Sequence, residues 1–217
     1  MKNNSKVKKN GLGGLTASAH IELHSIESLK LWGKKKDSLA ATFGQALKNL
    51  STLEYAARQD DPYADFALLE IERVINQAFG EYTQSLATLP SMISSRIQLG
   101  EAQSKKPVRR ELFINSRFGW RLISLLEMYD VLMVRLTDAN FKAQLSRKAF
   151  ETQKRVAIQT MQHALDTSAS MQHSGVTRQD MATNNAKAIA AQEKHGAIPF
   201  EVLEGVERAE FAPAIRG

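Results

Sequence analysis

The chain has 217 residues, of which 43% are hydrophobic and 24% charged, and its formal net charge is +6. This composition is typical of a globular protein large enough to bury its own core. The absence of cysteine excludes disulfides and every site built on a thiolate. No apolar run approaches the roughly 18 residues that span a bilayer, and the basic N-terminus "MKNNSKVKKNGLGG" lacks the apolar stretch of a secretory signal. We therefore expect a soluble, cytoplasmic protein.

The N-terminal third is predicted to contain an arm, a strand and two helices. Residues 1–17, rich in Lys, Asn and Gly, are expected to form a flexible basic arm, and residues 18–217 a single helical domain. "AHIELHS" alternates between polar and apolar residues, which indicates a short strand. "SIESLKLW" predicts a short helix that breaks at Gly33. Asp37 or Ser38 is expected to cap the longer helix that follows.

Residues 61–89 carry the clearest helical pattern. Asp61 followed by Pro62 suits a helix cap and a first helical residue. Apolar residues then repeat at spacings of three and four and predict one buried stripe: Leu68, Ile71, Ile75, Ala78, Tyr82, Leu86 and Leu89.

The central segment changes from a strand pattern to a helix pattern. Residues 107–115 predict a strand, with Val108, Leu112 and Ile114 on the face that also carries Arg110. The other, displayed face carries Arg109, Glu111, Phe113 and Asn115. Helices are predicted over 117–136 and 146–165, and a buried hydrogen bond between Tyr129 and Asp130 is expected to hold the packing of the first.

The C-terminal part is expected to hold one further helix. Thr177 and Asp180 form a capping box for a helix that ends at His195 and Gly196, and the tail is expected to be extended. The predicted fold class is thus mostly α, with one or two short strands.

Signatures of catalysis or metal binding are weak. "HIELH" resembles a metal triad, but on a strand His20 and His24 lie about 13 Å apart, too far to share one ion with bonds of about 2.1 Å. Phosphate-binding, dinucleotide-binding and nucleophile-elbow motifs are absent from the sequence. Asp60, Asp61 and Asp65 are better explained by helix capping than by paired-carboxylate catalysis. We expect no catalytic residue, no metal site and no cofactor, and we expect that the protein is not an enzyme.

Charge is distributed unevenly along the chain. Residues 54–81 hold seven acids against two arginines, whereas residues 1–36 hold eight lysines against Glu22 and Glu27. Residues 105–117 hold five basic side chains against Glu111 alone. Segregated positive charge is typical of a surface that binds a polyanion.

The position of the central strand favours DNA as that polyanion. A lone strand must pair with something, and two copies from a symmetric dimer would form an antiparallel ribbon that fits the major groove. Helices 117–136 and 146–165 would then interlock across the dimer axis, in the strand–helix–helix order of ribbon-helix-helix DNA binders. The window 18–57 has the same order and is the alternative position of the ribbon.

The DNA-contacting residues expected on this basis fall into three groups. Ribbon side chains would contact bases or phosphates, flanking lysines would anchor phosphates, and the arm would add attraction without sequence preference. The candidates are Lys105, Lys106, Arg109, Arg110, Phe113, Asn115, Arg117, Lys8 and Lys9.

Four segments resemble a family of proteins encoded on integrating conjugative elements. They are "RQDDPYADFALLEIE" (58–72), "PVRRELFINSRFGWRLISLLEMYDVLMVRL" (107–136), "SGVTRQDM" (174–181) and "GAIPFEVLEGVERAEFAPAI" (196–215). The resemblance implies a sequence-specific DNA-binding regulator of the ribbon-helix-helix type, with extra helices, that switches on conjugative transfer genes. The chain departs from the family pattern at Arg110, Phe113 and Arg117, where an aliphatic residue, a basic residue and a proline are usual.

The function expected is therefore a transcriptional regulator, an activator, that binds double-stranded DNA as a homodimer or higher even oligomer. RNA polymerase is a further expected partner, and a membrane is not. The alternative is a structural or assembly component of a conjugation machinery. In that case the basic surface would bind an acidic protein, for which the acidic helix 61–89 of a second copy is a candidate.

Overall fold

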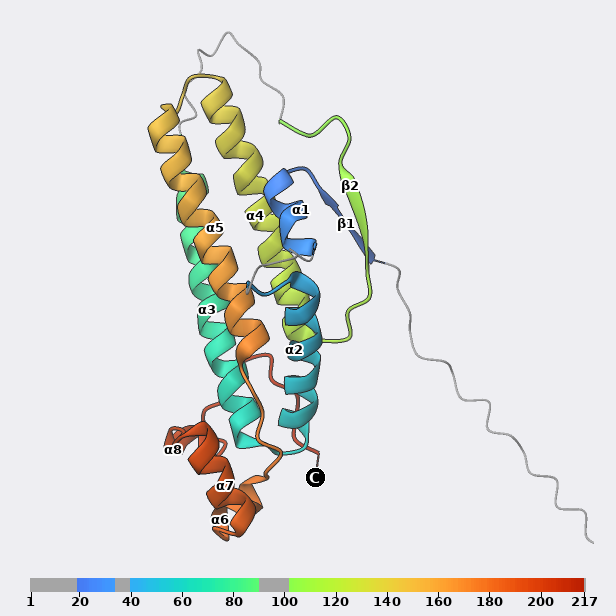
Figure 1. Ribbon diagram of the computed structural model, residues 1–217, viewed down its shortest axis with the longest axis vertical. Coiled ribbons are helices and arrows are strands. Elements are labelled where there is room, and N and C mark those ends of the chain that lie inside the picture. The colour runs from blue at the N-terminus through green and yellow to red at the C-terminus, as the bar shows by residue number, and fades with distance from the viewer. Residues whose placement is uncertain (1–18, 34–39, 90–101, 217) are drawn as a thin grey trace, which may run out of the picture.

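The computed structural model describes residues 19–33, 40–89 and 102–216. The expected arm, with Lys8 and Lys9, lies outside the described residues. Figure 1 shows the order of the elements. They are β1 (Ala19–Leu23), α1 (Ile26–Trp32), α2 (Phe43–Arg58), α3 (Pro62–Thr88), β2 (Val108–Leu112), α4 (Arg117–Phe141), α5 (Arg147–Ser170), α6 (Arg178–Ala182), α7 (Ala186–His195) and α8 (Phe200–Leu203).

Four helices, α2 to α5, make an elongated bundle (Figure 1). The two strands and α1 lie along one side of this bundle, and α6 to α8 gather at one end. The predicted stripe of α3 faces the core: Leu68, Ile71, Ile75, Ala78 and Tyr82 are buried, and Leu86 and Leu89 pack partly buried against them. The mostly α fold class is thus confirmed. None of the helices in the described ranges has the length and hydrophobicity needed to cross a membrane.

Local capping signals place several helix ends. Asp61 accepts hydrogen bonds from the backbone N–H groups of Tyr63 and Ala64 at 2.9 and 3.1 Å, with Pro62 as the first helical residue, as predicted. Helix α1 ends at Gly33, also as predicted. The prediction for α2 was wrong, because its cap is Thr42, which forms a capping box with Gln45; Asp37 and Ser38 lie outside the described residues.

The C-terminal region differs from its prediction in two respects. The capping box of Thr177 and Asp180 is present, but α6 ends at Ala182 and a second helix, α7, begins after the cap Asn185. The break has a local cause, since Asn184 adopts a left-handed φ of 46° that no helix continues through. The tail is not wholly extended either, because it contains the short helix α8.

The strand prediction was wrong in one important respect: the central strand has a partner in its own chain. Strands β1 and β2 pair antiparallel, with Ile21 opposite Arg110 at the centre of the register. Residues so distant in sequence leave no local signal of their pairing. The chain therefore contains two strand–helix–helix units, β1–α1–α2 and β2–α4–α5, joined through α3. Both candidate windows form the ribbon together, so the lone strand no longer provides a reason to expect a dimer.

Candidate nucleic-acid interface

The two-stranded ribbon has one buried face and one exposed face. Ile21, Leu23 and Leu112 are buried against the helices. Because side chains alternate along a strand and opposite residues share a face, the intervening positions are displayed together. Those positions are His20, Glu22, Arg109 and Glu111, all exposed. The ribbon thus presents polar side chains from both strands on one surface.

The candidate residues within the described ranges all reach solvent. They are Lys105, Lys106, Arg109, Arg110, Phe113, Asn115 and Arg117. Phe113 is 93% exposed, which is unusual for an aromatic side chain and leaves it available to a partner. Arg110 is exposed although the alternation places it on the helix side of the ribbon. A long arginine stem can carry its charged head out to water from such a position.

The displayed face is less basic than the sequence of the central strand predicts. Pairing places Glu22 of β1 opposite Arg109, and Arg109 Nε donates to Glu111 Oε1 at 3.0 Å. The face therefore carries one guanidinium, two carboxylates and one imidazole. Both side chains of the Arg109–Glu111 pair are more than half exposed, and such pairs contribute little free energy. Arg109 can consequently exchange Glu111 for another acceptor at small cost.

A buried carboxylate from α4 fixes the junction between β1 and α1. Asp130, 4% exposed, accepts from the backbone N–H groups of His24 and Ser25 at 2.8 and 2.9 Å, and from Ser25 Oγ at 2.6 Å. The predicted bond between Asp130 and Tyr129 was wrong, because adjacent residues of a helix do not face each other and the Asp130 carboxylate points to this turn. The Tyr129 ring lies instead against Tyr82, with centroids 5.9 Å apart.

A second buried carboxylate, from α2, fixes the junction between β2 and α4. Glu54 Oε1 accepts from Ser116 Oγ at 2.7 Å and from the backbone N–H of Phe118 at 2.8 Å. Ser116 in turn caps α4 through the N–H of Gly119 at 2.8 Å. Each unit thus contributes the acid that holds the other unit's strand-to-helix turn. This reciprocal arrangement fixes the ribbon relative to the bundle.

Gly119 is needed where the end of the ribbon meets α4. A Cβ atom at this position would lie 2.7 Å from Cγ2 of Ile114 and 3.3 Å from Cβ of Ser116. A contact under 3.0 Å forces a neighbour to move, and here the neighbours belong to the segment that joins β2 to α4. The glycine therefore permits the close approach of this segment to the helix.

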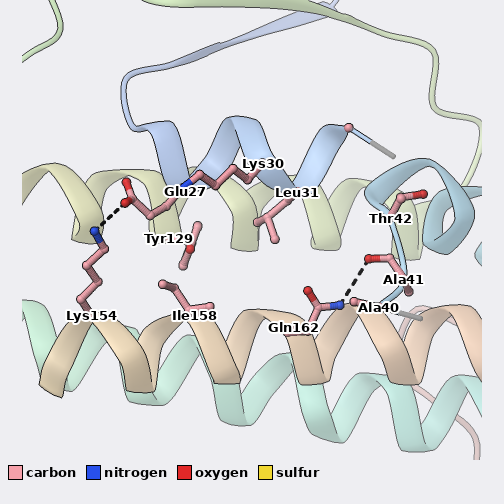
Figure 2. A pocket seen from close by; sticks show the side chains of 11 residues that line it. Glu27, Lys30, Leu31, Ala40, Ala41, Thr42, Tyr129, Lys154, Ile158 and Gln162 are labelled. Carbon is pink, nitrogen blue, oxygen red and sulfur yellow. Dashed lines mark hydrogen bonds and ion pairs between the residues drawn. The ribbon is translucent and has the colours of Figure 1, made fainter. Parts of the chain in front are cut away.

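A pocket of about 250 Å³ lies between the two units (Figure 2). At one end Lys154 Nζ of α5 pairs with Glu27 Oε1 of α1 at 2.6 Å. At the other end Gln162 of α5 donates to the backbone oxygen of Ala41, which precedes α2, at 3.3 Å. These contacts connect α1 and the start of α2 to α5, and so join the first unit to the second behind the ribbon.

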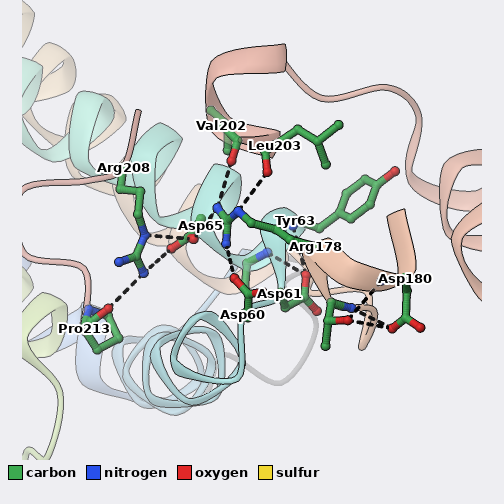
Figure 3. A network of polar contacts seen from close by, with 12 residues as sticks. Asp60, Asp61, Tyr63, Asp65, Arg178, Asp180, Val202, Leu203, Arg208 and Pro213 are labelled. Carbon is green, nitrogen blue, oxygen red and sulfur yellow. Dashed lines mark hydrogen bonds and ion pairs between the residues drawn. The ribbon is translucent and has the colours of Figure 1, made fainter. Parts of the chain in front are cut away.

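Two acidic residues near the start of α3, Asp60 and Asp65, form a partly buried network with two arginines (Figure 3). Asp65, fully buried, accepts from Arg208 Nε at 2.9 Å and from Arg178 Nη2 at 2.8 Å. Arg178 also binds Asp60 and the backbone oxygens of α8. The network ties the C-terminal segments to the bundle, and the segments that carry the sequence resemblance supply it. Capping explains Asp61, as predicted, but not the other two acids.

The sequence model of the transcriptional regulator AcaB matches residues 11–216, nearly the whole chain. The chain belongs to the AcaB family of transcriptional regulators. This result confirms the resemblance noted from the four segments. No curated protein sequence matches the chain significantly.

A solved structure agrees with the AcaB assignment. The crystal structure of AcaB from uropathogenic E. coli is similar with a TM-score of 0.55, over 88% of this chain and 98% of that chain. The two sequences are 13% identical, so this likeness concerns the fold alone.

Several contacts of the ribbon were not predicted. His20 and Glu22 were considered as metal ligands and as part of the alternative ribbon window 18–57, but not as neighbours of Arg109 and Glu111. Glu54 and Asp130 were not linked to the ribbon at all. One signal in the sequence could have located the two strand-to-helix junctions. Ser25 and Ser116 each follow a strand and precede a helix, as N-cap residues do. Among the described residues no group of three or more potential ligands is placed to hold a metal ion.

Proposed function

We propose that this chain is a sequence-specific regulator that binds double-stranded DNA through the β1–β2 ribbon, in the manner of ribbon-helix-helix proteins. The observation that carries the proposal is an exposed, polar, two-stranded antiparallel ribbon anchored to a helical bundle by two buried carboxylates. A ribbon of this kind fits the major groove of B-DNA, where each base pair presents a distinct set of donors and acceptors. Membership of a transcriptional regulator family supports DNA as the ligand.

The side chains on the ribbon suit base recognition. Arg109 can donate two parallel bonds to O6 and N7 of a guanine, and Glu22 or Glu111 can accept from the amino group of a cytosine. The exposed side chains near the ribbon would contact phosphates or sugars: Lys105, Lys106, Arg110, Asn115 and Arg117. Phe113 is suited to contact a thymine methyl group.

The charge of the displayed face indicates that this face provides sequence specificity and that other residues provide most of the affinity. Its two carboxylates repel phosphates, so the face itself adds little general attraction for DNA. Affinity would come from the flanking cations and from Lys8 and Lys9, which act through counterion release. Such a protein should discriminate strongly between sequences and lose affinity quickly as salt rises. Activation of conjugative transfer genes, with RNA polymerase as a partner, completes the proposed role.

The alternative, in which the basic surface binds the acidic helix 61–89 of a second copy, is less well supported, because three of the five acids in these residues are buried. Asp61, Asp65 and Glu72 of that region are 2%, 0% and 8% exposed. They are used by a helix cap, by two arginines and by the backbone N–H of Glu210. These three acids are not available to an external partner, and Glu70 and Glu81 are the acids of this helix that remain partly exposed.

Duplex binding by matched arginine variants tests the proposal. Arg109 and Arg73 are 56% and 55% exposed and both are ion-paired with glutamate, but Arg73 lies on α3. We expect Arg109→Ala to weaken binding to a promoter fragment about 5- to 150-fold, the loss that one bidentate base contact produces. Arg73→Ala should bind as the wild type does. Equal affinity of both variants and the wild type, with unchanged thermal stability, would exclude the ribbon as the reader.

A further inference from the structure

The ribbon is formed by two different strands of one chain. An antiparallel pair of strands has an approximate twofold axis through the centre of its register, here between Ile21 and Arg110. This axis exchanges β1 with β2. It relates Glu22 to Glu111, which are identical, and His20 to Arg109, which are not. The two halves of the displayed face therefore have one residue in common and one that differs.

The residue that differs changes what each half can recognise. Arginine presents a rigid fork of donors that matches the two acceptors of guanine. A neutral imidazole has one donor and one acceptor, and cannot make the same bidentate contact. A palindromic site would present identical base edges to both halves, so one half would be mismatched.

The ends of the ribbon are also unequal. The axis relates Phe113, 93% exposed, to His24, which is half-buried and whose Nδ1 accepts from the backbone N–H of Ser104 at 3.2 Å. An exposed aromatic ring thus extends the β2 half of the displayed face, and the β1 half has no equivalent. The helices that follow differ as well, with 7 residues in α1 and 25 in α4.

We infer that one chain recognises one non-palindromic duplex site, with the arginine half and the histidine half reading different bases. This inference rests on the proposed function, because it assumes that the ribbon enters the major groove. It departs from the symmetric arrangement in which two identical strands from two copies read a palindrome. A single chain already supplies both strands, so the ribbon needs no second copy to be complete.

Substitutions that make the ribbon symmetric provide the test. The full-length protein would be used to select binding sites from a randomised duplex library, in parallel with His20→Arg and Arg109→His. The wild type should select a non-palindromic motif, with one chain per duplex by native mass spectrometry. His20→Arg should shift the selected motif toward a palindrome that repeats the arginine half-site, and should bind that palindrome about tenfold tighter than the wild type does. Arg109→His should lose the guanine preference of its half.

The outcomes distinguish the inference from the proposed function. No enriched sequence with the wild type would contradict both. A palindromic wild-type motif, two chains on one motif, or an unchanged motif in both folded variants would overturn the inference and leave ribbon binding intact. His20 and Arg109 are exposed, so both variants should fold, and thermal unfolding would verify this. Arg73→Ala, remote from the ribbon, should select the wild-type motif.

Discussion

Ser25 Oγ donates a hydrogen bond of 2.6 Å to Asp130 Oδ1, across a sequence separation of 105 residues. This contact connects the end of β1 to the middle of α4, and its counterpart between Ser116 and Glu54 connects the start of α4 to α2. Both acids are buried, and both accept backbone N–H groups as well as a serine hydroxyl. These hydrogen bonds form only when the two strands hold one orientation relative to α2 and α4, and they therefore fix the ribbon on the bundle.

Removal of the Asp130 carboxylate should destabilise the fold and loosen the ribbon. Asp130→Ala leaves two backbone N–H groups and one hydroxyl without acceptors, and should lower the free energy of unfolding by about 2–4 kcal/mol. Asp130→Asn should cost less, because the amide retains one acceptor oxygen. Denaturant unfolding measures both effects. Equal stability of Asp130→Ala and the wild type would show that the contacts of Asp130 at the β1–α1 junction contribute nothing to the free energy of unfolding.

Gly119→Ala should destabilise the protein although alanine favours helix. The new Cβ would approach Ile114 to 2.7 Å, and overpacking of this kind costs about 1–3 kcal/mol. Gly80, in α3, is the matched control, because a Cβ there meets nothing within 4 Å. Gly80→Ala should stabilise the protein by about 0.5–1 kcal/mol. The two melting temperatures should therefore move in opposite directions, and a shift of both upward would contradict the close approach at Gly119.

Arg178→Ala should destabilise the C-terminal segment without altering DNA preference. The change leaves the buried Asp65 with one arginine instead of two and breaks the link to α8. A buried charge left without any partner costs about 3–5 kcal/mol, and the cost here should be smaller because Arg208 still binds Asp65 through two nitrogens. Lys187→Ala, at an exposed position of α7, is the control and should be nearly neutral. Thermal unfolding and site selection by the folded protein would measure the two effects, and a changed motif would place the network in DNA recognition.

The Glu27–Lys154 pair should contribute stability that depends on pH. Burial raises the pKa of Glu27, but the hydrogen bond from Lys154 and the charges of Lys154 and Lys30 outweigh it, so the pKa lies below its ordinary value of 4.5. A carboxyl group with a lowered pKa stabilises the folded state above its unfolded pKa, and this contribution disappears as the pH falls through the folded pKa.

Glu27→Gln should therefore be less stable than the wild type at pH 6, by about 0.5–1 kcal/mol. The difference should shrink below about pH 4.5 as the wild-type carboxyl group becomes protonated. Denaturant unfolding at a series of pH values measures it, with Glu193→Gln, exposed on α7, as the control. A difference that grew on acidification would contradict the assigned pairing.

Much of the helical fold follows from local sequence patterns. The cap at Asp61, the stripe from Leu68 to Tyr82 and the capping box at Thr177 were predictable because they depend on neighbours within one or two turns. The pairing of β1 with β2 was not, because nothing within either strand specifies a partner so distant in the chain. For the same reason the sequence did not predict that Asp130 and Glu54 bind the strand-to-helix junctions. Nor did it predict that Glu22 lies opposite Arg109 and offsets its charge on the displayed face. The exposure of Arg109 and Phe113 was predictable from alternation, whereas the exposure of Arg110 and the electrostatic surroundings of Arg109 were not.

The most direct test of the account is the coupling between Arg109 and the base it would read. A double-mutant cycle would combine wild type and Arg109→Ala with the selected duplex and the same duplex carrying 7-deazaguanine, which lacks the N7 acceptor. If the Arg109 fork binds that guanine, each change alone should weaken binding, and the pair should show a coupling energy of about 1–3 kcal/mol. A coupling energy near zero at every guanine of the site would contradict base recognition by the ribbon.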